Sequence, residues 1–541
     1  MENLSGIAVK GDPSPPTVQV MERDVDVAII GNGPSGIFLS LLLSGHRPFY
    51  AGDHPDPFLS YKLKQQPQKS ILDQDLQELS EGLEGRSNNQ LALLMDTLLH
   101  PNADIGENLP STLNWKCDQS KHISHVVIGD SQPGGSWHSM KGEIQSLSLG
   151  SWLELPQYSF QEWTTQNVGD RSCDVSSKRV TLGSVAKYYE DYVIEMGLQE
   201  NMMNGVRVTK AIKCPSRVVC TIGSPKSCAS PSSKLPPRPF KMHPCDLPMH
   251  TVDSGLILSE RGGSSDPDTL SNYSCSSDSE DDGICCNNAA EKVLHDYKWC
   301  LKGTGKQGDV IVRAKNLVLA CGIGDSPRQL GVGGEDAPFV CHRFSDFCQK
   351  LESIDPCYPV VIVGGGLSAA DAVLLCLSKG HKVAHIFHQD AKDSSLIYNK
   401  MPQAIYPEYG RLLKLMNNEE QNEFYTAVSQ SRVCEFTYGN CCTYKDNKEK
   451  TTTIPISLAG VFIGSETNLD FLPTRIGLQL AIDPFHPINA KTNPMDVDPI
   501  TFESELFPSL YALGPLAGDH FVRFVLGSGL GVCRHLVDKL F

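Results

Sequence analysis

Two glycine-rich turns in the sequence have a spacing that lets the backbone approach a phosphate group. In the first turn, three glycines stand between the apolar run 25–30 and the apolar run 37–44. In a strand–turn–helix unit of this kind, the first glycine permits the tight turn, the second admits a pyrophosphate, and the third packs helix against strand. The helix N-terminus then faces the phosphates, so the context predicts a dinucleotide-binding turn. Its predicted contact residues are Gly31, Gly33, Pro34, Ser35 and Gly36.

The second turn repeats this pattern with one change at the third position. It follows the apolar run 359–363 and precedes the apolar run 370–378, and alanine replaces the third glycine. Alanine spaces helix and strand slightly farther apart, a change often tolerated in nicotinamide-binding turns. Its predicted contact residues are Gly364, Gly366, Ser368 and Ala369. We therefore predict FAD at the first turn and a nicotinamide cofactor at the second.

The side chains after the second strand of the nicotinamide unit indicate which cofactor it takes. An NAD site commonly carries Asp or Glu there, whereas this chain has His388 and Gln389, with Lys392 close behind. A 2′-phosphate is repelled by an acid and accepted by His or Lys, so we predict NADPH, with His388 as a contact. His381, His385 and His388 also suggest a metal cluster, but alternation along a strand separates them onto different faces.

Two acidic residues compete for the role of binding the FAD ribose. Asp53 follows the strand-like run 47–52 at the distance where an acidic side chain meets ribose hydroxyls, and we predict it as the contact. Asp130 follows another strand-like run, 125–129, and is the alternative. The glycine turn after Asp130 supplies further predicted cofactor contacts, although its tryptophan could equally be a core residue. These contacts are Gly134, Gly135, Ser136 and Trp137.

Two later segments repeat an apolar strand that ends in a small-residue turn. They are residues 317–322 and 510–519, and the second precedes the glycine-punctuated run 526–531. The chain thus starts and ends with cofactor-type segments around a nicotinamide unit. We predict an α/β fold with two Rossmann-like dinucleotide-binding domains, the FAD domain built from both chain ends and the NADPH domain inserted into it. The predicted contacts in these segments are Gly322, Gly514 and Asp519.

The domain boundaries follow from these motifs and from one segment of unusual composition. Residues 223–288 are rich in Ser, Pro and acidic residues and cannot bury enough apolar surface to offset chain entropy. We predict a disordered insertion there, whose proline motif at 235–239 could bind a protein partner and whose serines could be phosphorylated. The other predicted parts are a flexible segment (1–24), the first part of the FAD domain (25–222), its return with a linker (289–356), the NADPH domain (357–465) and the C-terminal part of the FAD domain (466–541).

The composition argues against several classes of protein. A formal charge of -16 and a pI near 5.5 disfavour a nucleic-acid-binding protein, which needs clustered Lys and Arg. The longest apolar run near the start, 36–45, is too short for a membrane span of about twenty residues, so we expect an intracellular, soluble chain, with the cytoplasm as the favoured compartment. The 19 cysteines come without a secretory signal and indicate reduced thiols. They include no CxxC or CxxxxC pair, which disfavours a dithiol–disulfide reductase.

Several segments carry a resemblance to known proteins. Residues 320–322 stand where flavin-dependent monooxygenases have an Ala-Thr-Gly linker, and residues 134–138 look like their Gly-Gly-x-Trp segment. Longer motifs resemble the oxidative stress-induced growth inhibitor family, and these are residues 30–37, 79–86, 96–101, 150–156, 513–519 and 521–524. The resemblance runs from about residue 25 to the C-terminus apart from the insertion. It implies a monooxygenase-like flavoprotein linked to growth restraint, cell death and oxidative stress responses.

One motif departs from the monooxygenase pattern. The fingerprint of that group has Phe and Gly before a His and an aromatic residue after it. Here Asp336 and Pro338 occupy the Phe and Gly places ahead of His342, and Phe347 falls one position late. The motif therefore matches the monooxygenase fingerprint only in part.

Two functions from different classes remain. The first is an NADPH-dependent FAD monooxygenase that uses O2 on an unidentified small molecule. Because the cofactor carries this chemistry, we predict no catalytic acid or base. The alternative is a weakly catalytic or non-catalytic flavoprotein scaffold or redox sensor that regulates growth or differentiation through partners. The monooxygenase is the leading hypothesis, and the support for the alternative is the partial fingerprint and the acidic insertion.

Overall fold

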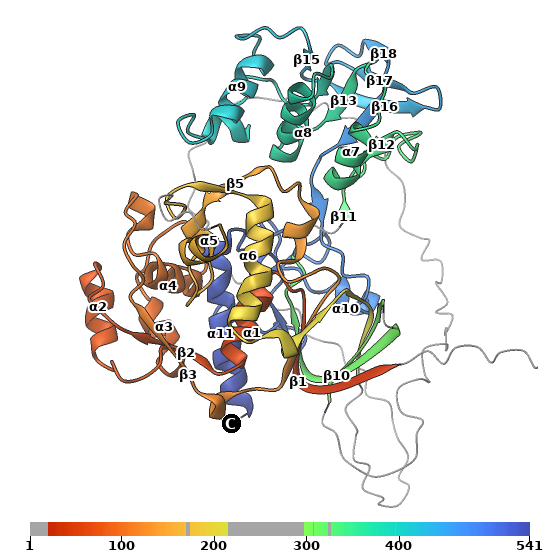
Figure 1. Ribbon diagram of the computed structural model, residues 1–541. Helices are drawn as coiled ribbons and strands as arrows, with labels where there is room; N and C mark the ends of the chain where they lie inside the picture. Colours follow the sequence, from red (N-terminus) through yellow and green to blue (C-terminus); the bar gives the residue numbers. More distant parts are fainter. Residues whose placement is uncertain are drawn as a thin grey trace, which may run out of the picture. The chain divides into compact units, whose positions relative to one another are not determined.

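A computed structural model of the chain describes residues 20–168, 174–214, 297–306, 308–322, 326–394 and 396–540 (Figure 1). The predicted insertion at 223–288, with its proline motif and serines, lies outside these residues, as do residues 1–19 of the predicted segment 1–24. Within the described ranges, no helix combines the length and apolarity needed to cross a lipid bilayer.

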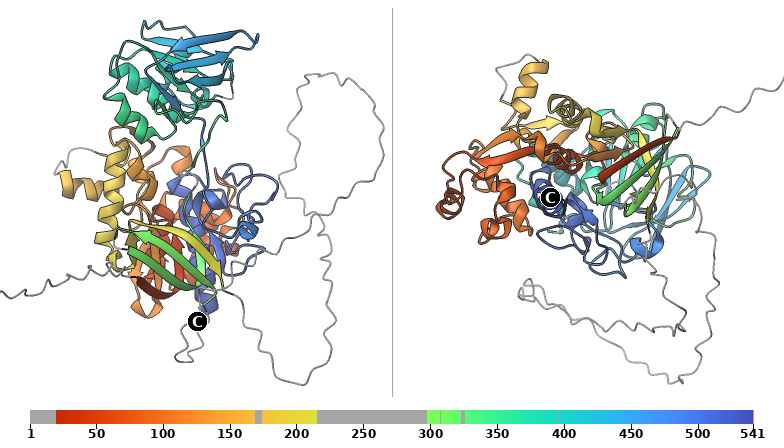
Figure 2. Two further views of the ribbon diagram at one scale, coloured as in Figure 1. Left: turned by 90° about the vertical axis from the view of Figure 1, so that its right-hand side faces the viewer. Right: turned by 90° about the horizontal axis from the view of Figure 1, so that it is seen from below.

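The first sheet joins strands from both ends of the chain. Its strands are β1 (Met21–Ile30), β4 (His125–Gly129), β7 (Met202–Asn204), β8 (Val206–Lys213), β9 (Trp299–Gly305), β10 (Gly308–Leu319) and β21 (Leu510–Ala512). The order is β7-β4-β1-β10-β9-β8, and β21 pairs with β10. Strand β9 runs antiparallel to both of its neighbours, β10 and β8, whereas the other pairings are parallel. Far apart in the sequence, β1 and β10 lie side by side (Figure 2). The predicted dinucleotide-binding fold built from both chain ends is confirmed.

Both faces of this sheet are covered, which explains why the end of β1, Val27–Ile30, is continuously apolar and buried. Val27 and Ile29 belong to a core shared with α1 (Pro34–Leu43), α4 (Gln90–Leu99), α6 (Leu182–Glu195) and α11 (Val522–Leu540). Ala28 and Ile30 point into a second core on the opposite face, which α10 (Thr474–Gly477) helps to cover. Alternate side chains of one strand therefore enter two separate cores.

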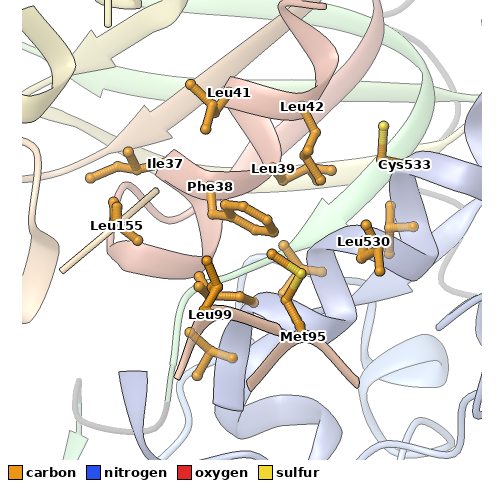
Figure 3. Close-up of a cluster of buried hydrophobic side chains, with 14 of the residues drawn as sticks. Ile37, Phe38, Leu39, Leu41, Leu42, Met95, Leu99, Leu155, Leu530 and Cys533 are labelled. Carbon is orange, nitrogen blue, oxygen red and sulfur yellow. The ribbon is translucent and has the colours of Figure 1, made fainter. Parts of the chain in front are cut away.

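The glycine-punctuated run 526–531 lies in the interior of α11, although each glycine there costs about 1 kcal/mol relative to alanine. Close packing accounts for these glycines. A Cβ at Gly527 would be 2.3 Å from the backbone nitrogen of Ala92 in α4, and one at Gly529 would be 2.8 Å from the Phe38 ring of α1. Figure 3 shows Phe38 in one buried cluster with side chains of α4 and α11, among them Met95, Leu99, Leu530 and Cys533.

The second sheet is entirely parallel, with the order β12-β19-β13-β14-β15. Its strands are β12 (Val340–Cys341), β13 (Val360–Val363), β14 (Val383–Ile386), β15 (Tyr425–Val428) and β19 (Leu458–Val461), and its helices are α7 (Phe344–Leu351), α8 (Leu367–Ser378) and α9 (Pro407–Met416). Strand β12 and helix α7 precede residue 357, where the sequence analysis began this domain. The short pair β11 (Ser326–Pro327) and β20 (Ser465–Glu466) is antiparallel and connects the chain segments that enter and leave this unit.

The remaining elements form smaller sheets and covering helices. Strands β2 (His46–Tyr50) and β3 (Leu113–Cys117) make an antiparallel ribbon outside the first sheet, as do β5 (Gln145–Leu149) and β6 (Arg179–Thr181). Strands β16 (Arg432–Thr437), β17 (Cys441–Lys445) and β18 (Thr451–Pro455) form a three-stranded antiparallel sheet. The further helices are α2 (Pro57–Lys64), α3 (Leu76–Ser80) and α5 (Phe160–Val168).

Candidate functional site

The three glycines of the first turn have different surroundings. Gly31 lies at φ +117°, and a Cβ there would be 2.2 Å from the Ala320 carbonyl oxygen. A Cβ at Gly36 would be 2.0 Å from the Gly31 carbonyl oxygen. At Gly33 a Cβ would meet only the Gly134 carbonyl oxygen, at 4.0 Å. The first and third glycines are therefore needed for packing, whereas the second lies beside open space at the N-terminus of α1.

The loop after β4 lies against this turn. Gly134 and Gly135 adopt φ values of +114° and +60°, and the Gly134 backbone N–H donates to the Asn32 carbonyl at 2.8 Å. A Cβ at Gly135 would be 3.3 Å from the backbone of Gly33. The structure thus brings together two glycine segments that are far apart in the sequence.

The C-terminal segment closes the other side of the turn. Gly514 lies at φ +58°, and a Cβ there would be 2.6 Å from Oγ of Ser35, in the first turn of α1. Five residues later, Asp519 is 4% exposed and accepts a hydrogen bond from Ser87 Oγ to Oδ1 at 2.7 Å. Its Oδ2 is buried with no hydrogen-bond partner in the described structure. Burial raises the pKa of Asp519 to about 7, against the opposing effect of the Ser87 hydrogen bond.

An unpaired buried acceptor is costly, so Oδ2 of Asp519 fits a ligand that brings a hydroxyl donor. The open space beside Gly33 fits a phosphate, because the N-terminus of α1 has no side-chain cap and its first N–H groups lack intrahelical partners. Together these features match a dinucleotide that carries both hydroxyl and phosphate groups.

The topology separates the two candidate acids for the ribose. The Asp53 prediction treats the preceding strand as the neighbour of β1, but β2 pairs with β3 outside the first sheet. Asp53 is 85% exposed and forms an ion pair with Lys64. The parallel neighbour of β1 is β4, and Asp130 follows it directly, with Oδ2 2.7 Å from Arg207 Nη2. The geometry therefore favours Asp130, because Asp53 follows a strand that lies outside the sheet.

The second turn reproduces the pattern of the first with partners from its own unit. Gly364 lies at φ +134°, and a Cβ there would be 2.2 Å from the Phe462 carbonyl oxygen. No atom lies within 4 Å of a Cβ built at Gly366. Ala369 is fully buried, and Ser368 is exposed in the first turn of α8. This turn too has a tightly packed first glycine and open space at the second glycine of the motif.

The end of β14 carries the residues predicted to choose the nicotinamide cofactor. His388 and Lys392 are exposed, and Asp390 lies between them in the sequence. The Asp390 carboxylate accepts hydrogen bonds from the Lys392 backbone at 2.8 Å and from Gln430 at 3.1 Å. Oε1 of Gln389 is buried, and the described residues supply no hydrogen-bond partner for it. Gln389 is not among the predicted contacts, although it directly follows His388 at the end of the β14 segment.

His385, one of the three histidines considered above for metal binding, is committed to contacts within the protein. His385 is buried, and its Nε2 and Nδ1 lie 2.8 Å from the Gly364 carbonyl oxygen and 3.0 Å from the Tyr425 hydroxyl. Burial lowers the pKa of His385 to about 4, so the ring is neutral at pH 7. His385 therefore supports the glycine turn. In the part of the chain that the structure describes, no group of three or more His, Cys, Asp or Glu side chains is arranged to hold a metal ion.

The segment that departs from the monooxygenase fingerprint is held by a buried carboxylate. Glu335 is 6% exposed and accepts hydrogen bonds from the backbone N–H groups of Leu330 at 2.6 Å and Gly331 at 2.7 Å. Nε2 of His342 lies 2.9 Å from the same carboxylate. These contacts fix the loop ahead of β12. The His342 ring is held by its hydrogen bond to Glu335.

The remaining predicted contacts near the first turn are Gly322, Ser136 and Trp137. Gly322 lies at φ +68° with no atom within 4 Å of a Cβ built there. Ser136 is exposed, and the Trp137 ring is 6.1 Å from the ring of Tyr189. Sequence reasoning missed Asn32, whose side chain donates to the Ser131 carbonyl at 2.8 Å, and Ser87. The position of Asn32 between two glycines of the turn could have identified it from the sequence. No residue near Ser87 in the sequence indicates its contact with Asp519.

Comparisons with known proteins agree with this geometry. A family model described as pyridine nucleotide-disulphide oxidoreductase matches residues 304–489. The chain is similar to solved structures of bacillithiol disulfide reductase Bdr from Bacillus cereus (TM-score 0.53, 14% identity, 96% of this chain and 100% of that chain). It is also similar to ornithine hydroxylase PvdA from Pseudomonas aeruginosa (TM-score 0.51, 11% identity, 96% and 100%). These likenesses show the fold, which is that of the two-dinucleotide-binding-domain flavoproteins.

A closer relative shows the family. Oxidative stress-induced growth inhibitor 1 of Mus musculus is 37% identical over 523 residues, which cover 95% of each chain. The segments named above as resembling that family lie within one fold with two cofactor-type turns. The chain therefore belongs to the oxidative stress-induced growth inhibitor family and has the fold of the flavin-dependent oxidoreductases.

Proposed function

We propose that this protein is an FAD-containing, NADPH-dependent oxidoreductase of the monooxygenase type. The observation that carries the proposal is the first turn, where open space beside Gly33 lies at an uncapped helix N-terminus and Asp519 offers an unpaired buried oxygen. When bound, FAD would supply hydride transfer from NADPH and the transfer of one oxygen atom of O2 to a substrate, with the other oxygen atom leaving as water.

The residues of this chain bind and orient the two cofactors. The N-terminus of α1 and the backbone around Gly33 would hold the FAD pyrophosphate, and Asp519 Oδ2 would accept a hydrogen bond from a ribityl hydroxyl. Asp130 would accept from the adenosine ribose hydroxyls in place of Asp53. The backbone around Gly366 and the N-terminus of α8 would hold the NADPH pyrophosphate, with His388 and Lys392 near the 2′-phosphate.

The likeness to a disulfide reductase raises a second enzyme class on the same fold. Such a reductase normally exchanges electrons between flavin and a pair of thiols. This sequence has no CxxC or CxxxxC pair, and the described cysteines include no disulfide. We therefore favour oxygen as the acceptor over a disulfide.

A second candidate function is a flavoprotein scaffold or redox sensor in growth control. The observation that favours it is the Glu335–His342 pair, which commits the fingerprint histidine to a structural contact. Such a protein would bind FAD and protein partners with little turnover. The link to growth restraint comes from the name of the mouse relative and is part of this proposal.

An absorption spectrum of the purified full-length chain, followed by anaerobic addition of NADPH or NADH, tests these proposals. An enzyme of the proposed type would show oxidised flavin bands that NADPH bleaches faster than NADH and that O2 restores. Gly366→Val should retain the flavin bands and lose their bleaching by NADPH. Flavin bands that NADPH does not bleach would support the scaffold, and bleached flavin reoxidised by a small disulfide but not by O2 would support the reductase. A colourless protein that fails to bind added FAD would contradict all three.

A further inference from the structure

A buried ion-pair cluster centres on Arg523, in the first turn of α11. The guanidinium makes a bidentate contact with Asp96 of α4, in which Nη2 lies 2.6 Å from Oδ2. Nη2 also lies 2.8 Å from Oδ1 of Asp104. The side chains of Arg523 and Asp96 are only 4% and 7% exposed. The charges of Arg523 and Asp96 are therefore shielded from water and paired in a single bidentate arrangement.

An aromatic side chain completes the cluster. The Arg523 guanidinium carbon lies 4.8 Å from the ring centroid of Trp152, a distance typical of a cation–π contact. Asp104 also lies 3.4 Å from Nε of Arg86, whose side chain is 64% exposed. Arg86, Asp96, Trp152 and Arg523 belong to four separate sequence motifs that resemble the growth inhibitor family, and the proposed function assigns none of them a role.

The same cluster is connected to Asp519. Ser87, which follows Arg86, donates to Oδ1 of Asp519 at 2.7 Å and accepts from the Asn89 backbone at 3.0 Å. Asn89 caps α4, because its side chain accepts from the Ala92 backbone N–H at 2.9 Å. Ala92 in turn contacts Gly527 of α11 so closely that no side chain fits between the helices. The segment that holds Asp519 is thus connected to α4, and α4 contacts α11 through both Ala92 and Asp96.

Buried ion pairs are poor sources of net stability. Replacing such a pair with apolar side chains of similar volume is often neutral or stabilising, whereas removing one partner alone is strongly destabilising. A bidentate, stacked arginine does, however, fix orientation more strictly than apolar packing does. The cluster is therefore better suited to positioning than to stabilising.

We propose that Arg523 and Asp96 are positioning residues that hold Asp519 and the start of α11 in the geometry required for flavin binding. This inference rests on the proposed function, since it concerns the residue proposed to contact FAD. Arg523 acts through Ser87 and the α4–α11 contact and does not itself touch the cofactor.

The test separates positioning from stability by comparing four forms of the full-length protein. The double variant Arg523→Met/Asp96→Leu removes the pair without leaving a buried charge, and Arg523→Lys keeps the charge without the bidentate contact. Arg313→Met is the matched control, because Arg313 pairs with Glu22 and Asp24 at 2.8 and 2.7 Å on the first sheet, away from Asp519. The measurements are thermal unfolding of the apoprotein, the Kd for added FAD, and the visible circular dichroism of bound flavin.

We expect the double variant to unfold near the wild-type temperature, to bind FAD at least about tenfold more weakly and to change the visible circular dichroism of the flavin. Arg313→Met should match the wild type in all flavin measurements. A stable double variant with wild-type Kd and dichroism would overturn the inference. Should the double variant not fold, Arg523→Lys decides, because unchanged flavin dichroism and Kd in that variant also contradict a positioning role. A wild-type protein that binds no FAD would instead contradict the proposed function.

Discussion

The two glycine turns share one local geometry but differ in where their surroundings come from. The first turn contacts Ala320, the loop at Gly134 and the segment at Gly514, so three distant parts of the chain meet there. The second turn contacts Phe462 and otherwise residues of its own compact unit. Gly134, Gly514 and Asp519 beside the first turn are buried, whereas His388 beside the second turn is exposed. A long-range, buried site should depend strongly on single residues, while an exposed local site should tolerate change and be tuned by charge.

The largest effect is expected from the third glycine of the first turn. Gly36→Ala places a Cβ 2.0 Å from the Gly31 carbonyl oxygen, so it should destabilise the protein by about 3 kcal/mol or more in urea unfolding. Gly33→Val is the matched control, because Gly33 has extended backbone angles and open space around it. The apoprotein of that variant should keep the unfolding midpoint of the wild-type apoprotein, and the variant should lose bound flavin. Normal flavin content in folded Gly33→Val would remove the first turn from the FAD site.

A pH dependence specific to Asp519 should follow from its burial. Its pKa is about 7 in the folded protein against 3.8 for an ordinary Asp, so the folded state favours the protonated form. This contribution to stability is complete below about pH 4 and is lost as the pH rises through about 7. Without FAD, Asp519→Asn should therefore unfold like the wild type near pH 4. Above pH 7 it should be more stable than the wild type by on the order of 1–4 kcal/mol.

The comparison of urea unfolding curves of the two apoproteins across pH 4 to 8 measures this effect, since other titrating groups cancel in the difference. A difference that does not vary with pH would show that Asp519 titrates as an ordinary exposed carboxyl group. The Asp519→Asn variant should also bind FAD more weakly, because its amide replaces a carboxylate acceptor that the ribityl hydroxyl needs.

Cofactor choice at the second turn should respond to charge at the end of β14. His388→Asp places a carboxylate near the proposed 2′-phosphate and should reduce the preference for NADPH over NADH by on the order of 1–3 kcal/mol. His381→Asp is the control, because His381 lies at the opposite end of β14, before its first residue. The ratio of kcat/KM for flavin reduction by the two cofactors measures the effect. An equal shift in both variants, or none in either, would exclude His388 from the site.

The smallest effect is expected where the two acids near the first turn are compared. Asp130→Ala should weaken FAD binding by about 1 kcal/mol, because it removes a single hydrogen-bonding group at the edge of the site. Asp53→Ala should leave the Kd for FAD unchanged, since Asp53 follows the ribbon outside the sheet. Fluorescence titration of the apoproteins with FAD distinguishes the two. Weaker binding by Asp53→Ala alone would restore the assignment that the sequence favoured.

Local patterns predicted the elements around both turns well, because each depends on contiguous residues. The strand ahead of the first turn ends at Ile30, and the strand before Asp130 spans His125–Gly129, as their apolar runs indicated. Gly31 and Gly364 adopt conformations and contacts that only glycine permits. Assignments that depended on pairing between distant segments were less secure. Nothing local showed that β2 would leave the sheet and that β4 would become the neighbour of β1.

The sequence by itself determined the two strand–turn–helix units and the family, because short-range backbone sterics and recurring motifs encode them. Only the tertiary structure decided that Asp130 rather than Asp53 stands at the sheet edge and that Ser87 supports Asp519. It also decided that the glycine run 526–531 lies inside a helix that packs on α1 and α4. The physical reason is the same in each case: close approach and hydrogen bonding between remote segments depend on how whole elements pack, and spacing along the chain does not record that packing.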